Sequence, residues 1–305
     1  MSDPRKDGGP TLEAARFQIR GQLGRGGMGV VYDAFDAQRG TRVALKTLRN
    51  TTPDALFRFK QEFRALADVR HPNLVTLYEL LCIGDEWLFT MELIDGVDIV
   101  THLRAHEPAR SPEHTVTLPT GVLPADDPPA GADTAFPRRP IDPALTRATF
   151  RQLALGLQAL HETGHIHRDL KPSNILVTRE GRVVLLDFGV IALREADSET
   201  AVRQRVIGTP RYMSPEQMQS AARLSPASDW YAFGLVLYEA LTGRPAFAGR
   251  FEGLLDAKLN ERYQRPADLD PAIPDDLDWL CRDLLRADPL TRSGAQQVLE
   301  CLGAE

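Results

Sequence analysis

The chain has 305 residues, of which 43% are hydrophobic, and its 36 Lys and Arg against 42 Asp and Glu give a formal net charge of -6 at pH 7. This is the composition of a globular protein with an ample core, and the absence of a basic cluster argues against a nucleic-acid partner. The three cysteines lack the spacing of a zinc site or disulfide framework, and no apolar run approaches the roughly 18 residues that span a bilayer. We expect a cytoplasmic protein with no membrane segment within this chain, preceded by a flexible tail at residues 1–16.

The first predicted elements are two strands joined by a glycine-rich turn. A strand from Phe17 to Leu23 leads into Gly24-Arg25-Gly26-Gly27-Met28-Gly29, and β-branched and aromatic residues follow from Val30 to Phe35. A lone GxGxxG pattern is weak evidence, because it also marks dinucleotide sites in which a helix begins at the glycines. Here a strand follows, which favours a hairpin whose backbone amides fold over phosphate groups. A merely flexible turn is the alternative.

A third strand and a helix come next. The alternation from Thr41 to Leu48 predicts a strand on which Lys46 and Ala44 share a face. An isolated strand lysine is usually solvated, so Lys46 requires a partner to be of interest. After Pro53-Asp54, Glu62 lies beside an apolar stripe at helical spacing. The stripe consists of Leu56, Phe59, Phe63 and Leu66. Two further strands are predicted, at Thr76 to Ile83 and Trp87 to Met91.

The sequence changes character between a short predicted helix, Ile99 to Arg104, and a helix that begins at Asp142-Pro143. Nine of the 22 prolines lie from Pro108 to Pro143, and this stretch has a single aromatic residue. Such a segment cannot bury enough apolar surface to offset its ordering entropy. We therefore expect a mobile inserted loop at about 105–141. A passive insertion and a docking or autophosphorylation segment that uses Ser111 or Thr117 both remain open.

The densest group of chemically useful residues follows the helix that begins at Asp142. That helix carries an apolar face of Phe150, Leu153, Leu157 and Leu160 and stops at Gly164. The run from His167 to Asn174 then reads HRDLKPSN, and Asp187-Phe188-Gly189 follows a predicted strand. Asn174 and Asp187 offer hard oxygen ligands that suit Mg²⁺. Asp169 could accept or orient a hydroxyl proton, and Lys171 could neutralise charge on a phosphoryl group.

These two runs together resemble the catalytic loop and the metal-binding loop of protein kinases, and the resemblance covers roughly residues 17 to 302. A polar surface loop would explain neither motif nor their separation. Lys171 matches the serine/threonine branch of the family, and the glycine-rich run resembles the eukaryotic-like kinases of bacteria. The resemblance implies that Lys46 contacts the α- and β-phosphates and pairs with Glu62. The implied catalytic residues are Asp169, Lys171, Lys46, Glu62, Asn174 and Asp187, with Asn174 and Asp187 as metal ligands.

The resemblance also implies a nucleotide site. Met91 falls at the gatekeeper position, and Glu92 and Ile94 fall on the hinge whose backbone groups would bond the adenine. Val31, Ala44 and Leu176 would sandwich the ring. The implied cofactor-binding residues are Leu23, Gly24, Arg25, Gly26, Gly27, Met28, Gly29, Val31, Ala44, Lys46, Met91, Glu92, Ile94 and Leu176. A column of Leu66, Leu77, His167 and Phe188 would mark an active arrangement, with His167 a packed core histidine and not a base.

The remaining matches lie in the second half of the chain. Val190 to Val206 corresponds to the activation segment, and phosphate on Ser198 or Thr200 would satisfy Arg168 unless the neighbouring acids already do so. Gly208 to Glu216 resembles the substrate-docking loop, with Ser214 in place of the commoner alanine. The resemblance implies a buried pair between Glu216 and Arg292. It also predicts that Asp229 caps the apolar helix that ends near Gly243 and tethers the catalytic loop. Further helical packing is expected from Leu277, Leu280, Cys281 and Leu284.

We interpret the chain as an α+β, bilobal protein-kinase fold. A small antiparallel-sheet N-lobe with one key helix is expected at 17–93, and a larger, mostly helical C-lobe at 94–305. The resemblance implies transfer of the γ-phosphate of ATP, with Mg²⁺, to Ser/Thr hydroxyls of protein substrates, including autophosphorylation through self-association.

Two other classes remain open. A pseudokinase would act as a nucleotide-binding scaffold, although such proteins usually lack one of the residues matched here by Lys46, Asp169 or Asp187. A small-molecule phosphotransferase of related fold could share the spacing between the acid and the asparagine. It would not be expected to carry the docking loop from Gly208 to Glu216.

Overall fold

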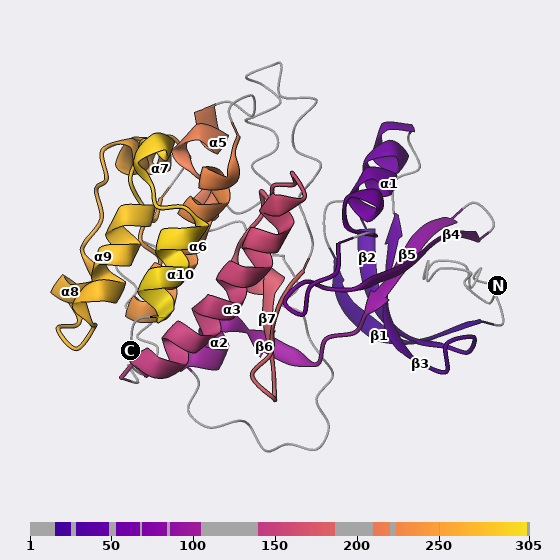
Figure 1. The fold of residues 1–305 in the computed structure, drawn as a ribbon. Helices are drawn as coiled ribbons and strands as arrows, with labels where there is room; N and C mark the ends of the chain where they lie inside the picture. The colour runs from indigo at the N-terminus through magenta and orange to yellow at the C-terminus, as the bar shows by residue number, and fades with distance from the viewer. Residues whose placement is uncertain are drawn as a thin grey trace, which may run out of the picture.

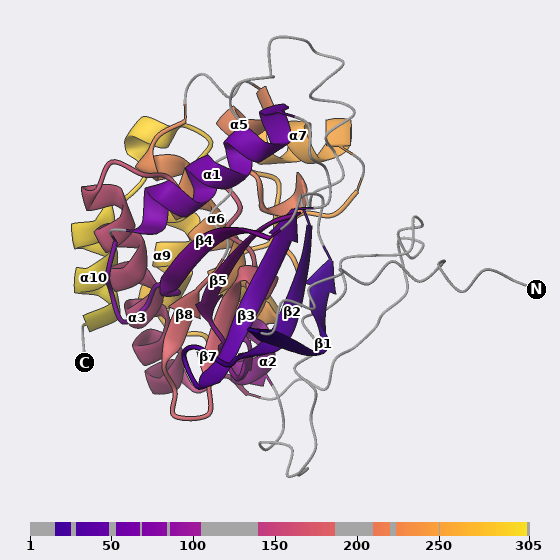
Figure 2. The ribbon, with the colours of Figure 1, turned by 90° about the vertical axis from the view of Figure 1, so that its right-hand side faces the viewer.

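The structure is a computed structural model, and it describes residues 16–25, 29–48, 53–67, 69–83, 86–104, 140–186, 210–219, 224–249 and 251–303. These residues form two lobes (Figures 1 and 2). A sheet with helix α1 over it makes the first lobe, and a set of helices with a small second sheet makes the other. The bilobal α+β fold predicted from the sequence is confirmed.

The N-terminal sheet has five antiparallel strands in the order β1-β2-β3-β5-β4. Their bounds are β1 (Phe17–Arg25), β2 (Gly29–Asp36), β3 (Thr41–Leu48), β4 (Leu77–Ile83) and β5 (Glu86–Glu92). The side chains of β3 alternate between two buried clusters. Val43 and Leu45 belong to a small cluster on one face, while Ala44 and Leu48 belong to the main core. Lys46 therefore shares its face with Ala44, as predicted.

Helix α1 (Pro53–Ala67) packs on the face of the sheet that belongs to the main core. Phe59 is fully buried, and its ring centroid lies 5.0 Å from that of Phe89 on β5. The ring of Phe63, one helical turn further on, lies 5.9 Å from the same partner. The predicted apolar stripe is thus what attaches α1 to the sheet, although the side chain of Leu66 lies outside the described residues.

The second lobe is mostly helical. Its longer helices are α3 (Pro143–Glu162), α6 (Pro226–Thr242), α7 (Phe251–Leu259), α9 (Asp275–Leu284) and α10 (Ala295–Gly303). Shorter elements are α2 (Ile99–Arg104), η1 (Pro172–Asn174), η2 (Pro210–Tyr212), α5 (Pro215–Gln219), α8 (Pro266–Leu269) and η4 (Pro289–Thr291). A small antiparallel sheet in the order β6-β7-β8 lies on α3, with β6 (Gly96–Asp98), β7 (Ile175–Thr178) and β8 (Val183–Leu185).

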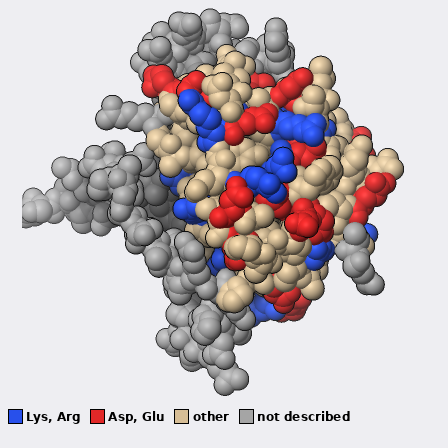
Figure 3. Space-filling view, turned by 90° about the vertical axis from the view of Figure 1, so that its left-hand side faces the viewer, with Lys and Arg blue, Asp and Glu red and all other residues tan. Residues whose placement is uncertain are grey.

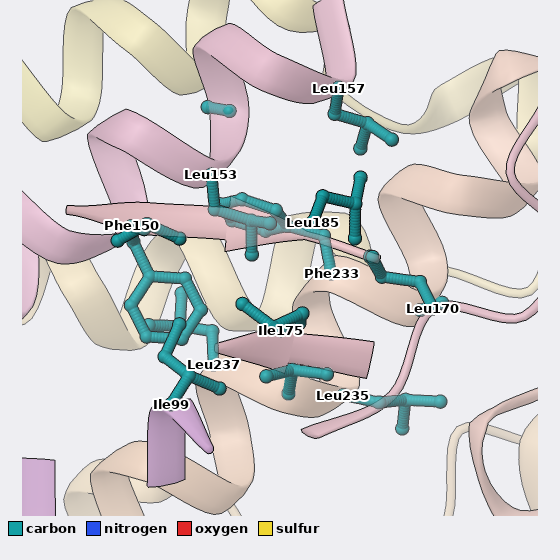
Figure 4. Close-up of a cluster of buried hydrophobic side chains, with 14 of the residues drawn as sticks. Ile99, Phe150, Leu153, Leu157, Leu170, Ile175, Leu185, Phe233, Leu235 and Leu237 are labelled. Atoms are coloured by element: carbon teal, nitrogen blue, oxygen red, sulfur yellow. The ribbon is translucent and has the colours of Figure 1, made fainter. Parts of the chain in front are cut away.

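The core of this lobe forms where α3, α6 and the small sheet meet. Asp142 is the N-cap of α3 and accepts a hydrogen bond from the Leu145 backbone N at 3.0 Å, and Gly164 beyond its end has φ of 80°. Phe150 packs edge-to-face on Phe233 of α6, with ring centroids 5.3 Å apart. Figure 4 shows these rings with leucines of both helices and of β8 around them. Helix α6 is buried on nearly all sides, which fits its almost wholly apolar sequence.

Two groups of polar contacts, one at Asn73 and one at Arg182, join the lobes. The loop before β4 runs beside β8, where Asn73 Nδ2 donates to the Val183 carbonyl at 2.7 Å and Leu185 N donates to the Asn73 carbonyl at 2.9 Å. Arg182, at the turn before β8, pairs with Glu92 through both carboxylate oxygens, at 2.5 and 3.1 Å. Because Glu92 ends β5, this ion pair ties the sheet lobe to the helical lobe.

The surface of the helical lobe carries acidic and basic side chains side by side (Figure 3). Among the described residues, no helix combines the length and the hydropathy needed to cross a bilayer. Residues 105–139, which include Ser111, Thr117 and most of the proline-rich insert, lie outside the described residues, as do the tail at 1–15 and the activation segment.

Gly29 provides a test of the sheet packing. A Cβ at this position would lie 1.7 Å from the Thr47 carbonyl oxygen, so any side chain forces β2 and β3 apart. We expect Gly29→Ala to lower the free energy of unfolding by about 1–3 kcal/mol, measured by urea denaturation. The control is Gly21→Ala on β1, where an added Cβ meets no atom within 4 Å. Equal effects of the two substitutions would contradict the assigned close approach.

Candidate active site

In the loop that joins α3 to β7, a lysine and an asparagine amide both donate hydrogen bonds to one carboxylate, that of Asp169. Lys171 Nζ donates to Asp169 Oδ2 at 2.7 Å, and Asn174 Nδ2 donates to the same oxygen at 3.0 Å. Asn174 also donates to the Asp169 carbonyl at 2.8 Å and sits in the 3₁₀ turn η1. These bonds fix Asp169 while its side chain stays 45% exposed, so the carboxylate remains open to a reactant.

A buried carboxylate from α6 holds the backbone of this loop. Asp229 is 1% exposed and accepts from the backbone N of His167 at 2.7 Å and of Arg168 at 2.8 Å. His161 Nε2, on α3, lies 2.8 Å from the same carboxylate. The predicted tether is confirmed. The predicted helix cap is wrong, because α6 begins one turn earlier, with Ser225 at the N-cap and Pro226 as its first residue.

Arg168 adopts a backbone conformation that residues other than glycine rarely take. Its φ is 70°, in the left-handed region. Its N–H is bonded to Asp229, and its carbonyl accepts from Gln217 Nε2 of α5 at 2.9 Å. Burial lowers the pKa of its guanidinium. Contacts from two helices thus hold Arg168 in an unfavourable conformation, as occurs at functional loops.

His167 is fully buried beneath the loop, which confirms that it is packed in the core. Its Nδ1 accepts from the Asp169 N–H at 3.3 Å. Its Nε2 lies 2.8 Å from the Leu186 carbonyl, which can only accept, so Nε2 carries the proton. One ring nitrogen therefore braces the loop internally, and the other connects the loop to the residue after β8.

Six of the residues expected around the nucleotide belong to one large buried cluster that has members in both lobes. This cluster contains Leu23, Val31, Ala44, Met91, Ile94 and Leu176. Lys46 is 7% exposed, pairs with Val31 in the sheet register, and has its Nζ 5.6 Å from the centroid of the Phe89 ring. Glu92 faces the other way and bonds Arg182, while its backbone N donates to the Thr76 carbonyl at 2.8 Å.

Several predicted residues cannot be placed. Gly26, Gly27 and Met28 lie outside the described residues, although Gly24 and Arg25 pair with Val31 and Val30 as a hairpin requires. The side chain of Glu62 is also outside the described residues, as are Asp187, Phe188, Ser198 and Thr200. The predicted contact of Glu62 with Lys46 and the predicted metal ligand at Asp187 therefore stay predictions.

The side chains predicted as metal ligands, an amide and a carboxylate, are of the kinds that bind a hard divalent cation. The hydrogen bonds from Asn174 to Asp169 use its amide nitrogen, which directs its amide oxygen away from Asp169. Carboxylate and amide oxygens are the ligands that such a cation prefers. Within the described ranges, no three His, Cys, Asp or Glu side chains come together as a metal site.

The docking loop is anchored by a buried ion pair. Arg292 Nη1 and Nη2 donate to the two carboxylate oxygens of Glu216 at 2.7 and 2.9 Å, with the arginine side chain fully buried. Ser228 Oγ of α6 donates to Glu216 at 2.8 Å. The predicted pair is confirmed. Ser214, where alanine is commoner, accepts from the Gln217 N–H through Oγ at 3.4 Å while its own N–H donates to Gln217 Oε1 at 2.9 Å, so it closes the start of α5.

The sequence reasoning missed three residues that shape this site. They are Gln217, which joins α5 to the catalytic loop; Arg182, which pairs with Glu92; and Lys258 of α7, which is fully buried. No local pattern marks them, since polar residues at such positions on short helices and turns are usually solvated.

A two-lobed fold with these loops in its helical lobe defines a protein kinase-like domain, and comparison with known proteins identifies the family. The protein kinase domain profile matches residues 17–301. The chain is 32% identical over 302 residues to the "Probable serine/threonine-protein kinase SCO3848" of Streptomyces coelicolor, covering 95% of this chain and 38% of that protein. It is 34% identical over 294 residues to the "DNA damage-responsive serine/threonine-protein kinase RqkA" of Deinococcus radiodurans, covering 93% and 39%.

A third relative is the "Serine/threonine-protein kinase PknE" of Mycobacterium tuberculosis, 32% identical over 261 residues that cover 85% of this chain and 40% of that protein. The chain belongs to the protein kinase family. It spans about two fifths of the length of these three relatives.

The pair of Glu216 and Arg292 can be tested by removing one partner. We expect Arg292→Met to lower the free energy of unfolding by about 3–5 kcal/mol, because it leaves a buried carboxylate unpaired. The control is Arg262→Met, whose ion pair with Asp256 is 59% and 60% exposed and should change stability by less than about 1 kcal/mol. A small effect at Arg292 would show that the buried pair does not anchor the loop.

The same pair predicts a pH dependence. Burial raises the pKa of Glu216, but the hydrogen bonds and charge of Arg292 outweigh burial and leave that pKa below its usual 4.5. A lowered carboxyl pKa contributes stability that is fully present above the unfolded value and is lost as pH falls through the folded value. Below pH 4.5, the wild type should lose more free energy of unfolding than Arg292→Met loses. Parallel acid curves would assign the acid sensitivity to other groups.

Proposed function

We propose that this chain is the catalytic domain of a serine/threonine protein kinase that transfers the γ-phosphate of ATP to hydroxyls of protein substrates. The observation that carries this proposal is the state of Asp169, whose carboxylate is fixed by Lys171 and Asn174 and yet remains open. The names of the relatives support the choice of serine and threonine as acceptors, as does Lys171 in the catalytic loop.

In this proposal, Asp169 accepts a hydrogen bond from the acceptor hydroxyl and orients its oxygen toward the phosphorus. Lys171 neutralises charge on the transferring group from its place 2.7 Å from Asp169. Lys46, on the face of β3 that it shares with Ala44, binds the α- and β-phosphates and pairs with Glu62. The acceptor proton has a receiving oxygen in Asp169, and positioning and charge neutralisation supply most of the catalysis.

Asn174 and Asp187 hold Mg²⁺ in this proposal, and the cation would supply charge neutralisation on the phosphates. The adenine lies between Val31 and Ala44 on one side and Leu176 on the other. Met91, Glu92 and Ile94 line its edge. Leu23 and residues 24–29 cover the phosphates. We place the division between the two lobes at residues 93 and 94, after β5, with the N-lobe at 17–93 and the C-lobe at 94–305.

The substrates are proteins with Ser or Thr acceptors, and the enzyme phosphorylates itself through transient self-association. Phosphate on Ser198 or Thr200 would supply a charge next to Arg168, whose guanidinium already bears the cost of burial. A nucleotide-binding scaffold without catalysis is the second candidate. The presence of all three of Lys46, Asp169 and Asp187 disfavours it.

Incubation with radiolabelled ATP, Mg²⁺ and a generic basic protein tests the proposal. We expect label in the protein acceptor and in the chain itself. The absence of transfer, with nucleotide binding intact, would identify a scaffold. Transfer to small alcohols or amines alone would identify a small-molecule phosphotransferase.

Asp169→Asn tests the assigned role of the carboxylate. The amide keeps the size of the side chain but presents an N–H group to one of the donors, so it cannot orient the acceptor as the carboxylate does. We expect kcat to fall by about 10²–10⁴-fold while nucleotide affinity changes by less than about threefold. The control is Asp268→Asn, an exposed acid on α8. Retained turnover in Asp169→Asn would refute the assignment.

A further inference from the structure

A buried lysine from α7 is bonded to the backbone of the docking loop. Lys258 lies in the last turn of α7 and is fully buried. Its Nζ donates to the carbonyls of Pro210 at 3.0 Å and Arg211 at 2.8 Å, and also to the carbonyl of Met213. An ammonium group has three donors, so every one of them is spent on this segment.

The surroundings of Lys258 are those of a packed core residue and not of a surface lysine. Its Nζ lies 5.7 Å from the ring centroids of Tyr231 on α6 and of Phe247. Burying an ammonium is costly unless it is hydrogen-bonded and compensated. Burial lowers the pKa of Lys258 to about 7, a fall that the charge of Glu216 opposes and that of Arg211 reinforces. The three carbonyl oxygens favour the charged form.

The three carbonyls belong to one short stretch of chain. Pro210 and Arg211 lie in the 3₁₀ turn η2, and Met213 follows just before α5. A turn this short makes few bonds of its own, and Met213 N to the Pro210 carbonyl at 3.2 Å is one of them. Lys258 therefore sets the curvature of the segment from one side. Gln217, bonded to Arg168 and Ser214, joins the following helix to the catalytic loop from the other.

We propose that Lys258 is a positioning residue that holds residues 210–213 in the shape that receives the acceptor polypeptide beside Asp169. The proposal rests on the proposed kinase function, since it concerns the docking loop of that site. It follows that loss of the Lys258 contacts should weaken binding of the acceptor polypeptide. Binding of the nucleotide, whose site is built from β1–β5 and β7, should be unchanged. Displacing a positioning segment by about 1 Å costs on the order of 10²-fold in rate.

The test uses Lys258→Met, which keeps an unbranched apolar chain and removes the three donors. We expect the KM for a protein acceptor to rise by about tenfold or more, with the KM for ATP within about twofold of the wild-type value. Lys258→Arg keeps the charge and donors and should recover part of the loss. The matched control is Lys60→Met on α1, where Lys60 lies over the ring of Trp87, and its acceptor KM should not change.

Hydrogen exchange gives a readout that does not depend on catalysis. In Lys258→Met, the backbone amides of Met213 and Met218, which donate to Pro210 and Ser214, should exchange faster than in the wild type. Amides of β3 and α3 should keep their wild-type rates. Uniformly faster exchange with a parallel loss of all activities would reduce Lys258 to a general contributor to stability and overturn the proposal.

An unchanged acceptor KM in folded Lys258→Met would also overturn it. Failure of the wild type to phosphorylate any protein would instead refute the proposed function. The exchange rates of the Met213 and Met218 amides would then decide by themselves whether Lys258 holds this segment.

Discussion

The site depends on one buried carboxylate that accepts hydrogen bonds from two consecutive backbone N–H groups. Asp229 lies in the first turn of α6, a helix most of whose residues are buried, and bonds the N–H groups of His167 and Arg168. Because α6 is enclosed by other elements, its position is fixed by the core and is not free to follow the loop. The position of the catalytic loop is thus set by the hydrophobic core through α6. For the same reason Arg168 keeps a positive φ that an isolated chain would avoid.

A second set of buried polar contacts extends this arrangement to the docking loop. Glu216 is paired with Arg292, and Lys258 Nζ donates hydrogen bonds to the carbonyls of residues 210, 211 and 213. Gln217 bonds the Arg168 carbonyl, so α5 and the catalytic loop meet at the residue that Asp229 also holds. These hydrogen bonds are directional and are buried, so water does not compete with them. They therefore hold a loop region in one conformation, as backbone hydrogen bonds hold a helix or strand.

The nucleotide side depends on a different constraint, the way in which the two lobes are joined. Asn73 bonds β8 through its side-chain amide and its carbonyl, and Glu92 and Arg182 form an ion pair between the lobes. Leu23, Val31 and Ala44 from the sheet share a buried cluster with Leu176 from the helical lobe. The relative position of the lobes therefore determines the shape of the apolar site expected for the adenine.

Much of this molecule follows from the sequence alone. The sequence predicted the strands β1 to β5, and alternation along β3 predicted the face of Lys46. Helical spacing predicted α1 and α3, and Asp142 and Gly164 marked the ends of α3 because caps and left-handed glycines are local properties. Motif resemblance predicted the pair of Glu216 with Arg292 and the tether at Asp229, since both rest on residue types at fixed places in a family. The cap assigned to Asp229 was wrong, because Ser225 and Pro226 begin the helix one turn earlier and leave the carboxylate for the loop.

Only the tertiary structure revealed Lys258, Gln217 and Arg182. Each donates to groups brought near by folding, 45 to 48 residues away for Lys258, 49 for Gln217 and 90 for the contact of Arg182 with Glu92. A hydrogen bond to a distant carbonyl leaves no periodicity in the sequence, because every residue carries a carbonyl group. The sequence therefore determined the elements and the reacting groups, whereas the packing of the helices decided which polar side chains hold them in place.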